Sequence, residues 1–452
     1  MSPFAERRAR LLESVGRRTA AVFVATPNAL RNNDVEHEFR QDSDVFYLTG
    51  FDEPDTVVVL SPNGHVREEG KEPEKSVFTM FVRPRDPERE VWDGYRAGIE
   101  GATGKYGADH AYPYAELTKR LPELLAGHDA VVYRFGGAFD ERLFAAIHHA
   151  RRTAGRTGLS APTRIVDPVE VLYEHRLRKT PPELEAMRRA CAITAEAHEK
   201  AMAIAMPGRY EFELEAVILE TFRRHGSERP AYGSIVGSGA NATVLHYRRN
   251  DRQIEDGDLV LIDAGCEFGY YASDVTRTFP ANGRFTDPQR AVYEAVLEAQ
   301  LACIEAVKPG VTQGDLHEKA VRVLTAALLR LGVIEGDLEE AIAKEAYKPF
   351  YMHKTGHWLG MDVHDVGAYF VPREDGSVDG KLRHRPLEPG MVITIEPGLY
   401  FGIGAEKAPA ALRGIGVRIE DDILVTEDGH ENLTAAIPKS VEDVERACRR
   451  TP

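Results

Sequence analysis

The sequence predicts two domains, an α/β domain in the first third and a larger domain in which helix pairs alternate with strands. A chain of 452 residues is long for one hydrophobic core. Short apolar runs alternate with helical stretches in the first third, whereas two later helix pairs are each followed by strands. Between these regions, Thr180-Pro181-Pro182-Glu183 has the N-cap and first-turn proline of a new helix. We therefore expect the domains to cover residues 1–175 and 176–452.

The expected elements of the first domain are typical of a largely buried sheet in an α/β fold. β-rich apolar runs predict strands at Ala21–Ala25, Thr56–Leu60, Ser76–Val82 and Ala130–Tyr133. Helical spacing and composition predict helices over Ala115–Leu125 and Phe139–Ala154.

The second domain has the pattern of a duplicated architecture, in which each of two helix pairs precedes a set of strands. The expected helices are Pro182–Ala205, Phe212–His225, Asp287–Val307 and Asp315–Leu331. The expected strands are Ser234–Val236, Leu259–Asp263, Asp274–Phe279, Met391–Glu396 and Gly416–Glu420. The polar stretch Arg373–Gly380 predicts an ordinary loop.

The composition indicates a globular protein with no affinity for polyanions. The formal net charge of −15 argues against binding to nucleic acid or to an anionic membrane. The first apolar run, Ala20–Ala25, is too short to span a membrane and lacks a signal-peptide cleavage pattern. The cysteines have no disulfide or zinc-site spacing, which favours a reducing compartment, and we expect a cytoplasmic protein.

Two aspartates stand at the ends of neighbouring strand-like runs. Asp263 ends one run, Asp274 begins the next, and Gly265 and Gly269 lie between them. A hairpin would bring the two carboxylates close together. Each aspartate alone is more simply an exposed turn residue. A buried carboxylate pair, however, repels itself unless a proton or a cation intervenes.

Three histidines, His353, His357 and His364, fall close together among glycines. A single histidine in such a place is more often a surface residue or a hydrogen-bonded core residue. Imidazole is nevertheless a common ligand of transition metals, and it exchanges protons near neutral pH. The group therefore offers both a metal ligand and proton-handling side chains.

Two further acidic positions occur in apolar β-rich runs. Glu396 ends one strand, where it could simply mark the point at which the chain reaches solvent. In the next run, the alternation of side chains places Arg418 and Glu420 on one face. Such a face is costly to bury unless its charges are paired or bound to metal, and the alternative is a solvated edge strand with a salt bridge.

Four carboxylates with one histidine form an oxygen-rich, thiol-free ligand set. Such a set suits two divalent ions, with manganese, cobalt, iron and zinc all compatible. Two ions about 3.5–4 Å apart can activate a shared water and stabilise an oxyanion. The chemistry that this combination indicates is hydrolysis.

Together these motifs resemble the creatinase/aminopeptidase P family of metallopeptidases. The resemblance covers most of the chain and keeps the order of the motifs. It rests on the runs Arg40–Phe51, Ile235–Asn241 with His246, Leu259–Gly265, Tyr270–Thr278, His353–Gly367, Glu396–Gly398 and Arg418–Asp422. Gly237 and Gly239 alone do not form a nucleotide-binding loop, because the full glycine fingerprint is absent.

The resemblance implies a creatinase-like α/β N-terminal domain followed by an α+β pita-bread catalytic domain with two divalent ions, usually manganese. By position, five residues match the metal ligands of the family: Asp263, Asp274, His357, Glu396 and Glu420. Asp274 and Glu420 match the ligands that contact both ions, and Glu396 is also our candidate proton shuttle. Four other residues match positions that bind substrate, assist the intermediate or lie near the metals: His246, His353, His364 and Arg418.

Three more positions bear on substrate binding. Arg383 matches a substrate contact of the family. Trp92 resembles a tryptophan that a neighbouring subunit lends to the active site, with a packing residue as an equal alternative. Lys354 is a departure, since glycine commonly follows the first histidine in the family. The lysine changes access or charge near the pocket and removes no ligand.

The implied activity is removal of an N-terminal residue that precedes proline, by a homotetramer or a homodimer. An Xaa-Pro dipeptidase shares the ligands, but the Arg40–Ser43 run, Trp92 and the His357-Trp358 pair favour the aminopeptidase. A methionine aminopeptidase would not need the large N-terminal domain. A peptide- or histone-binding module without activity is opposed by the intact ligand set.

Overall fold

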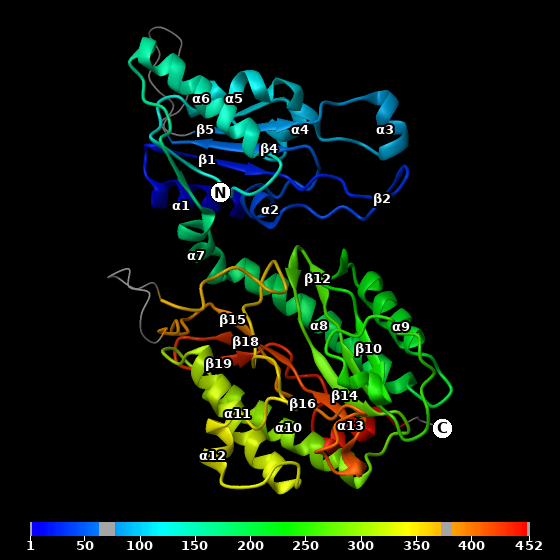
Figure 1. Cartoon of the computed structure of the whole chain (residues 1–452). Coiled ribbons are helices and arrows are strands. Elements are labelled where there is room, and N and C mark those ends of the chain that lie inside the picture. The colour runs from blue at the N-terminus through cyan, green and yellow to red at the C-terminus, as the bar shows by residue number, and fades with distance from the viewer. Residues whose placement is uncertain (1, 63–76, 372–381, 450–452) are drawn as a thin grey trace. The chain divides into compact units, whose positions relative to one another are not determined.

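The computed structural model describes residues 2–62, 77–371 and 382–449. The chain divides into two compact units, Met1–His175 and Arg176–Pro452 (Figure 1). Two expectations fall partly or wholly outside the described residues: the loop at Arg373–Gly380, and Ser76 at the start of an expected strand.

The first unit is built on a six-stranded mixed sheet of order β6-β5-β4-β1-β7-β8. β1 is antiparallel to β4 and parallel to β7. The strands are β1 (Thr19–Val24), β4 (Val57–Ser61), β5 (Val77–Val82), β6 (His110–Pro113), β7 (Ala130–Val132) and β8 (Arg164–Val166). A separate two-stranded hairpin is formed by β2 (Leu30–Asn32) and β3 (Val35–Glu36).

Helices α5 and α6 pack together and bury apolar side chains against this sheet. Leu121 of α5 and Leu143 of α6 share a core with Val59 of β4, which is why the strands are apolar on their buried faces. The helices of this region are α1 (Pro3–Val15), α2 (Ser43–Thr49), α3 (Pro87–Asp93), α4 (Gly98–Gly104), α5 (Leu117–Leu125), α6 (Asp140–Thr157) and α7 (Leu172–Leu177). The expected α/β alternation is confirmed.

The second unit contains the two expected helix pairs. α8 (Pro181–Ile204) packs against α9 (Glu211–Arg224), and α10 (Asp287–Ala306) packs against α11 (Gln313–Arg330) (Figure 1). Thr180 and Glu183 form the capping box that starts α8. The shorter helices are α12 (Leu338–Ala343) and α13 (Val441–Ala447), with 3-10 turns in the chain at Tyr114–Glu116, Pro168–Glu170, Gly239–Thr243 and Ala410–Leu412.

Each helix pair is followed by strands, as the duplicated pattern predicts. After the first pair come β9 (Arg229–Pro230), β10 (Ile235–Ser238), β11 (Leu259–Asp263), β12 (Cys266–Phe268), β13 (Tyr271–Ala272) and β14 (Thr276–Pro280). After the second come β15 (Val392–Ile395), β16 (Gly398–Tyr400), β17 (Gly416–Arg418), β18 (Asp421–Val425) and β19 (His430–Asn432). Two three-stranded sheets, β10-β11-β14 and β15-β18-β19, lie at the centre of the unit (Figure 1).

The strand expected over Gly416–Glu420 is wrong in one respect, because it is interrupted after Arg418. The chain changes its pairing partner there: β17 pairs with β16, whereas β18 pairs with β15. In the interruption, the amide of Glu420 donates to the carbonyl of Thr276 at 3.0 Å. The break therefore ties Glu420 to β14 in the other central sheet.

Two glycines permit close backbone approaches beside the acidic and histidine motifs. A Cβ on Gly265 would lie 1.8 Å from the carbonyl oxygen of Ser273, and one on Gly356 would lie 1.9 Å from that of Thr394. Any larger residue would displace the neighbouring strand.

The four cysteines, Cys191, Cys266, Cys303 and Cys448, are buried thiols without disulfides. Among the helices of the described ranges, none has the length and apolar character needed to cross a membrane.

Candidate metal centre

Asp263 and Asp274 lie side by side, as the expected hairpin requires. Asp263 is the last residue of β11, and the antiparallel pairing of β11 with β14 sets it opposite Thr276. The hydroxyl of Tyr232 is 2.6 Å from Oδ1 of Asp263 and 2.5 Å from Oδ1 of Asp274. The single proton of the Tyr232 hydroxyl can be donated to only one of the two carboxylates at a time. A second proton or a cation would therefore further reduce the repulsion between the carboxylates.

Glu396 and Glu420 approach from the other central sheet. Glu396 follows β15, and its Oε1 accepts a hydrogen bond from Thr394 Oγ1 at 3.2 Å. Glu420 lies in the break between β17 and β18, where its Oε2 accepts from Thr276 Oγ1 at 2.6 Å. Asp263 and Asp274 therefore lie at or near the ends of strands of the β10-β11-β14 sheet, and Glu396 and Glu420 lie at the ends of strands of the β15-β18-β19 sheet.

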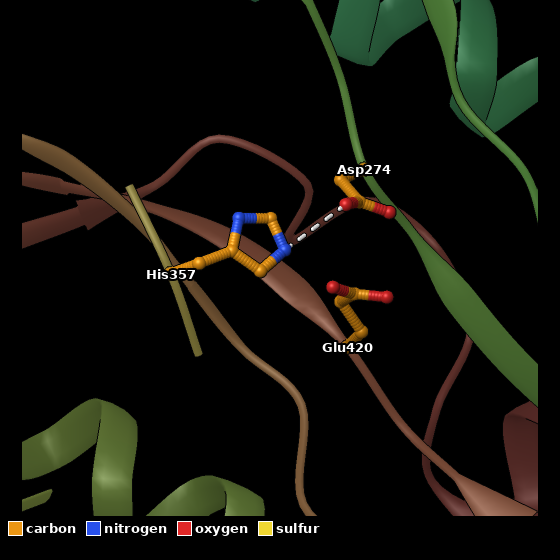
Figure 2. Close-up of side chains that lie close together, drawn as sticks. All are labelled: Asp274, His357 and Glu420. Carbon is orange, nitrogen blue, oxygen red and sulfur yellow. Dashed lines mark ion pairs between the residues drawn. The ribbon is translucent and has the colours of Figure 1, made fainter. Parts of the chain in front are cut away.

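His357 points its Nε2 atom into this cluster, 3.4 Å from Oδ2 of Asp274 and 3.5 Å from Oε1 of Glu396. Its Nδ1 is 3.0 Å from the carbonyl of Trp358, an acceptor that fixes the proton of the neutral ring on Nδ1. Figure 2 shows His357, Asp274 and Glu420 directed toward one another. Within the described chain, one donor atom from each lies within 4.8 Å of the others.

Burial and the charges of neighbouring carboxylates favour the protonated form of Asp263, Glu396 and Glu420. Burial raises the pKa of Glu396 to about 7, and burial with the charge of Asp274 raises the pKa of Glu420 well above its ordinary value. Burial also raises the pKa of Asp263, against the lowering by Arg418. Burial opposes the charged form of His357, but Asp274 and Glu396 outweigh it and raise the pKa to about 9.

This arrangement fits divalent cations. The site has four carboxylates, of which Asp263, Asp274 and Glu420 are buried and Glu396 is half-buried. Together with one imidazole and no thiolate, they match the preference of hard or borderline ions. Without metal, bound protons reduce the repulsion between the carboxyl groups of the cluster. Divalent cations would displace these protons and supply the positive charge instead. Asp274, His357 and Glu420 form the core of such a site, with Asp263 and Glu396 beside them.

Arg418 is buried and forms a hydrogen-bonded ion pair with Asp263. Its Nη2 donates to Oδ2 of Asp263 at 2.6 Å, its Nε to Thr276 Oγ1 at 3.1 Å, and its Nη1 to the Tyr400 hydroxyl at 3.1 Å. Arg418 is 4% exposed and Glu420 is 2% exposed. The alternative of a solvated edge strand is therefore wrong, because both side chains are directed into the buried cluster.

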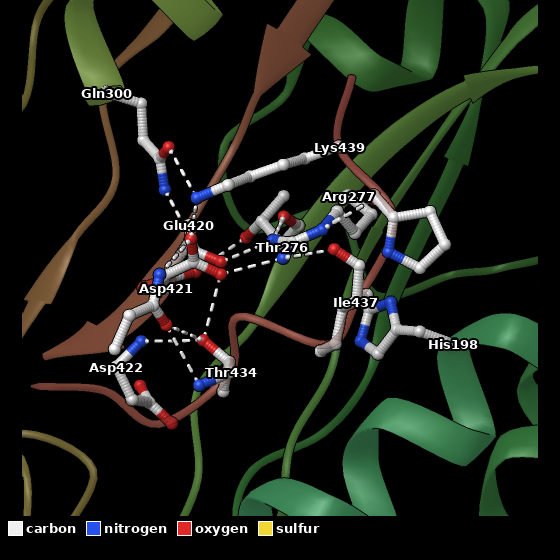
Figure 3. Close-up of polar contacts among 12 residues, drawn as sticks. His198, Thr276, Arg277, Gln300, Glu420, Asp421, Asp422, Thr434, Ile437 and Lys439 are labelled. Atoms are coloured by element: carbon white, nitrogen blue, oxygen red, sulfur yellow. Dashed lines mark hydrogen bonds and ion pairs between the residues drawn. The ribbon is translucent and has the colours of Figure 1, made fainter. Parts of the chain in front are cut away.

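A second polar network supports Glu420 from behind (Figure 3). Arg277 donates to the carbonyl of Glu420 at 2.6 Å and to Oδ1 of Asp421 at 2.7 Å. Lys439 also forms an ion pair with Asp421. Asp422 accepts the backbone amide of Asp274 at 3.1 Å. The three consecutive acids therefore have different roles. Glu420 belongs to the carboxylate cluster, Asp421 belongs to the ion-pair network, and Asp422 binds the backbone amide of Asp274.

The cluster opens onto a cavity of about 990 Å³ in the second unit. The three predicted histidines His246, His353 and His364 all line it. The Nδ1 of His353 is 2.7 Å from the carbonyl of Lys354 and its Nε2 is 2.8 Å from the Tyr400 hydroxyl. Burial, with the charge of Arg418, lowers the pKa of His353 to about 4, so the ring is neutral at pH 7.

The structure does not bring Trp92 and Arg383 into this cluster. Trp92 belongs to α3 of the first unit and is 83% exposed, so it does not pack in the core of its domain. Arg383 is exposed, and its backbone carbonyl accepts a hydrogen bond from the amide of Val371.

Sequence reasoning missed Tyr232 and Thr276, which contact candidate ligands. It also missed Tyr400, whose hydroxyl contacts Arg418 and His353. Thr276 could have been found, because side chains two apart along a strand share a face and it follows Asp274 by two. Tyr232 carries no such local signal, since the fold alone brings it to Asp263.

Two family models match the chain. The model of metallopeptidase family M24 matches residues 185–427, and that of the aminopeptidase P N-terminal domain matches residues 4–133. The chain therefore belongs to metallopeptidase family M24, which confirms the family expected from the motifs.

Similarity to Xaa-Pro aminopeptidases extends over nearly the whole chain. The Xaa-Pro aminopeptidase of Escherichia coli K12 is 43% identical over 98% of this chain and 96% of its own. The structure of Pseudomonas aeruginosa aminopeptidase PepP, 48% identical, covers 98% of this chain and 97% of its own with a TM-score of 0.91. Aminopeptidase P from E. coli with the inhibitor Pro-Leu, 42% identical, covers 99% and 98% with a TM-score of 0.90. The expected creatinase-like domain and pita-bread fold are thereby confirmed.

Proposed function

We infer that the chain acts as a metal-dependent Xaa-Pro aminopeptidase, a hydrolase that removes the N-terminal residue from peptides with proline in the second position. The observation that carries this function is the cluster of four carboxylates and one imidazole, of which Asp263, His357 and Glu396 line the cavity. It occurs in a chain whose near full-length relatives are named Xaa-Pro aminopeptidases. Those relatives favour the aminopeptidase over the dipeptidase.

Five residues hold two divalent ions in this proposal: Asp263, Asp274, His357, Glu396 and Glu420. Asp274, His357 and Glu420 would form the centre of this ligand set, since one donor atom from each lies within 4.8 Å of the others. When bound, such an ion pair supplies the Lewis acidity that activates water and polarises the scissile carbonyl. Manganese is the metal we propose.

Glu396 is the proposed proton shuttle. The bond that precedes proline is a tertiary amide, so the leaving nitrogen carries no N–H and must gain a proton as it departs. The Glu396 carboxyl is our candidate to take up that proton and to deliver it to the nitrogen. The carboxyl lines the cavity where substrate would lie, which supports this role.

The histidines and Arg418 are proposed to position substrate and ligands. The Nδ1–H of neutral His353 faces the Lys354 carbonyl, so its Nε2 accepts from Tyr400 and the ring is held in place. His246 and His364 are exposed on the cavity wall and can donate to substrate carbonyls. Arg418 keeps the Asp263 carboxylate oriented.

The remaining parts of the proposal concern the cell. We place the protein in the cytoplasm as a homotetramer or homodimer. Buried, unpaired thiols are compatible with a reducing compartment. Trp92, exposed on α3, is the residue we assign to the active site of a neighbouring subunit.

Metal analysis and peptide hydrolysis test this function together. We expect two ions per chain in the manganese-loaded protein, and hydrolysis of Ala-Pro-Ala that a chelator abolishes and manganese restores. Ala-Ala-Ala serves as the control peptide and should remain intact. If Ala-Pro were cleaved and Ala-Pro-Ala were not, the protein would be a dipeptidase. If neither were cleaved, the proposed function would be refuted.

A further inference from the structure

One wall of the cavity carries basic side chains that the proposed chemistry does not use. Lys354, His317 and His384 line the same cavity as three of the candidate metal ligands, Asp263, His357 and Glu396. Lys354 is exposed and makes no ion pair with any residue in the described part of the chain. Glu318 is the acidic residue of this wall, and it too makes no ion pair with a described residue. We call Lys354, His317 and His384 the basic wall.

Neighbouring groups fix the two imidazoles of the basic wall. The Nδ1 of His317, on α11, is 3.0 Å from Oγ1 of Thr355. The ring of His384 lies over Gly314, where a Cβ would come within 2.6 Å of it, and 4.6 Å from the ring of Phe370. Such held rings lose little conformational entropy when they bind a ligand.

Burial and the positive charge of Lys354 lower the pKa of His317. Burial lowers the pKa of His317 to about 4, and the positive charges of Lys354 and His384 lower it further in the same direction. His317 is therefore neutral at pH 7, and Lys354 is the cation that a ligand meets on this wall. A ligand that carries negative charge would gain a charge-assisted hydrogen bond from Lys354.

The spacing of the wall suits the third residue of a peptide. Lys354 precedes His357 by three residues, so their Cα atoms are at most about 11 Å apart. A peptide extends about 3.5 Å per residue, so a carboxylate on the third residue lies about 7 Å or more beyond the scissile bond. The flexible lysine stem can bridge the remaining gap.

We propose that the basic wall is a carboxylate-binding subsite for the third residue of the substrate, with Lys354 as its principal cation. The favoured substrates are peptides of sequence Xaa-Pro-Yaa in which Yaa carries a carboxylate. That group is either the chain terminus of a tripeptide or the side chain of aspartate or glutamate. This inference rests on the proposed function, since it assumes that the residue before proline is placed at the metal centre.

Kinetics on the manganese-loaded enzyme test the subsite and separate the two sources of carboxylate. The peptides are Ala-Pro-Ala, Ala-Pro-Ala-amide, Ala-Pro-Asp-amide and Ala-Pro-Lys-amide. We expect kcat/KM to be about threefold to tenfold higher for the two carboxylate peptides than for Ala-Pro-Ala-amide. Preference for only one of them identifies the source. Lys354→Ala should bring these ratios close to one, and Lys354→Glu should favour Ala-Pro-Lys-amide.

Lys348→Ala is the matched control, because Lys348 is an exposed lysine that pairs with Glu345 and does not line the cavity. It should leave all ratios unchanged. Equal kcat/KM for the carboxylate and amide peptides in the unaltered enzyme would overturn the subsite but not the aminopeptidase activity. Hydrolysis of none of the four peptides would overturn both.

A binding measurement gives a readout that does not depend on turnover. Pro-Leu, the inhibitor in the E. coli aminopeptidase P structure, and Pro-Leu-amide differ only in the terminal carboxylate. Calorimetry on the manganese-loaded protein should show tighter binding of Pro-Leu, and Lys354→Ala should remove most of that difference. An undiminished difference in Lys354→Ala would assign the carboxylate to another group and contradict the proposal.

Discussion

At the scale of single residues, the protonation of the cluster is linked to its cations. Without metal, Glu396, Glu420 and His357 bind protons more tightly in the folded protein than in the unfolded chain. Metal ligation requires the deprotonated forms, so cations and protons compete for the same atoms.

The first prediction follows from this competition. Binding of manganese at pH 7 should release protons, and the apparent affinity should rise with pH until it levels off near pH 9, above which His357 is neutral. Calorimetric titrations in buffers of different ionisation enthalpy measure the number of protons released. Release of none at pH 7 would contradict the assigned ligands.

The same pKa shifts determine how the folding stability of the metal-free protein changes with pH. Below pH 6.5 the raised pKa values of the cluster are opposed by His198, His317 and His353, whose pKa values burial lowers to about 4. Between about pH 6.5 and pH 9, the raised pKa values of Glu396, Glu420 and His357 make the folded state bind more protons than the unfolded state. The free energy of unfolding of the metal-free protein should therefore fall as pH rises through this range. Saturating manganese should remove most of that slope, and urea unfolding at several pH values tests both statements.

The variant Glu396→Gln tests the proposed proton shuttle. The amide cannot carry a proton to the leaving nitrogen, so kcat should fall about 100-fold or more. Metal content must be measured in the same preparation, because Glu396 is also a candidate ligand. Glu388→Gln is the control, since Glu388 pairs with Arg178 away from the cavity lining. A variant with normal kcat would exclude the shuttle role.

At the scale of elements, one buried ion-pair network joins β14 to β18. Arg277 and Asp421 are fully buried partners, and Lys439 adds a second cation. Burial alone would raise the pKa of Asp421, but the cations lower it well below its ordinary value. Its stabilising contribution is therefore complete above pH 3.8 and is lost only when pH falls well below that value.

Removal of this carboxylate gives the prediction at the element scale. Asp421→Ala should lower the free energy of unfolding by about 3–5 kcal/mol, because two cations would remain buried without a partner. It should also weaken metal binding, since Arg277 would no longer be held against the carbonyl of Glu420. Glu294→Ala, which removes an exposed helix pair with Arg290, is the control and should have no measurable effect. Urea unfolding compares the two variants, and equal stability would refute the role of the network.

The sequence was informative where structure is determined locally. The capping box of Thr180 and Glu183 and the apolar run that ends at Asp263 both carry their signal within a few residues. The short strands β12, β13 and β16 carry none, because strands of two or three residues exist only through their partners. The break after Arg418 has the same cause, since it marks a change of partner.

The candidate site divides in the same way. The motifs predicted the candidate ligands, because acids at strand ends and a histidine among glycines have a recognisable spacing. Tyr232 and Arg277 could not be assigned, because their partners are determined by how two sheets face each other. Contacts between side chains from different sheets depend on the whole fold, so they cannot be predicted from the neighbouring residues in the sequence.

At the scale of the whole molecule, the first unit presents apolar side chains that its own core does not bury. Val91 is 81%, Trp92 83% and Tyr95 90% exposed. Large exposed apolar groups are a recurrent feature of contact surfaces between proteins. They are consistent with the proposed association between copies of this chain.

The prediction at this scale concerns Trp92→Ala. Light scattering on the unaltered protein should give two or four times the chain mass of 50.2 kDa. Trp92→Ala should lower kcat/KM for Ala-Pro-Ala without changing the metal content, because a partner would lose its contact with substrate. Phe144→Ala, at a half-exposed aromatic of α6, is the control. A monomer with full activity would exclude the shared site.

Glu420 occupies a late position in the chain, in the break between β17 and β18. During translation, the other four candidate ligands leave the ribosome before it does. A nascent chain therefore offers cations an incomplete set until the segment around Glu420 is synthesised and its amide bonds to Thr276 of β14. Metal loading would then follow completion of the polypeptide, and a product released early by the ribosome, before Glu420, would carry no hydrolytic centre.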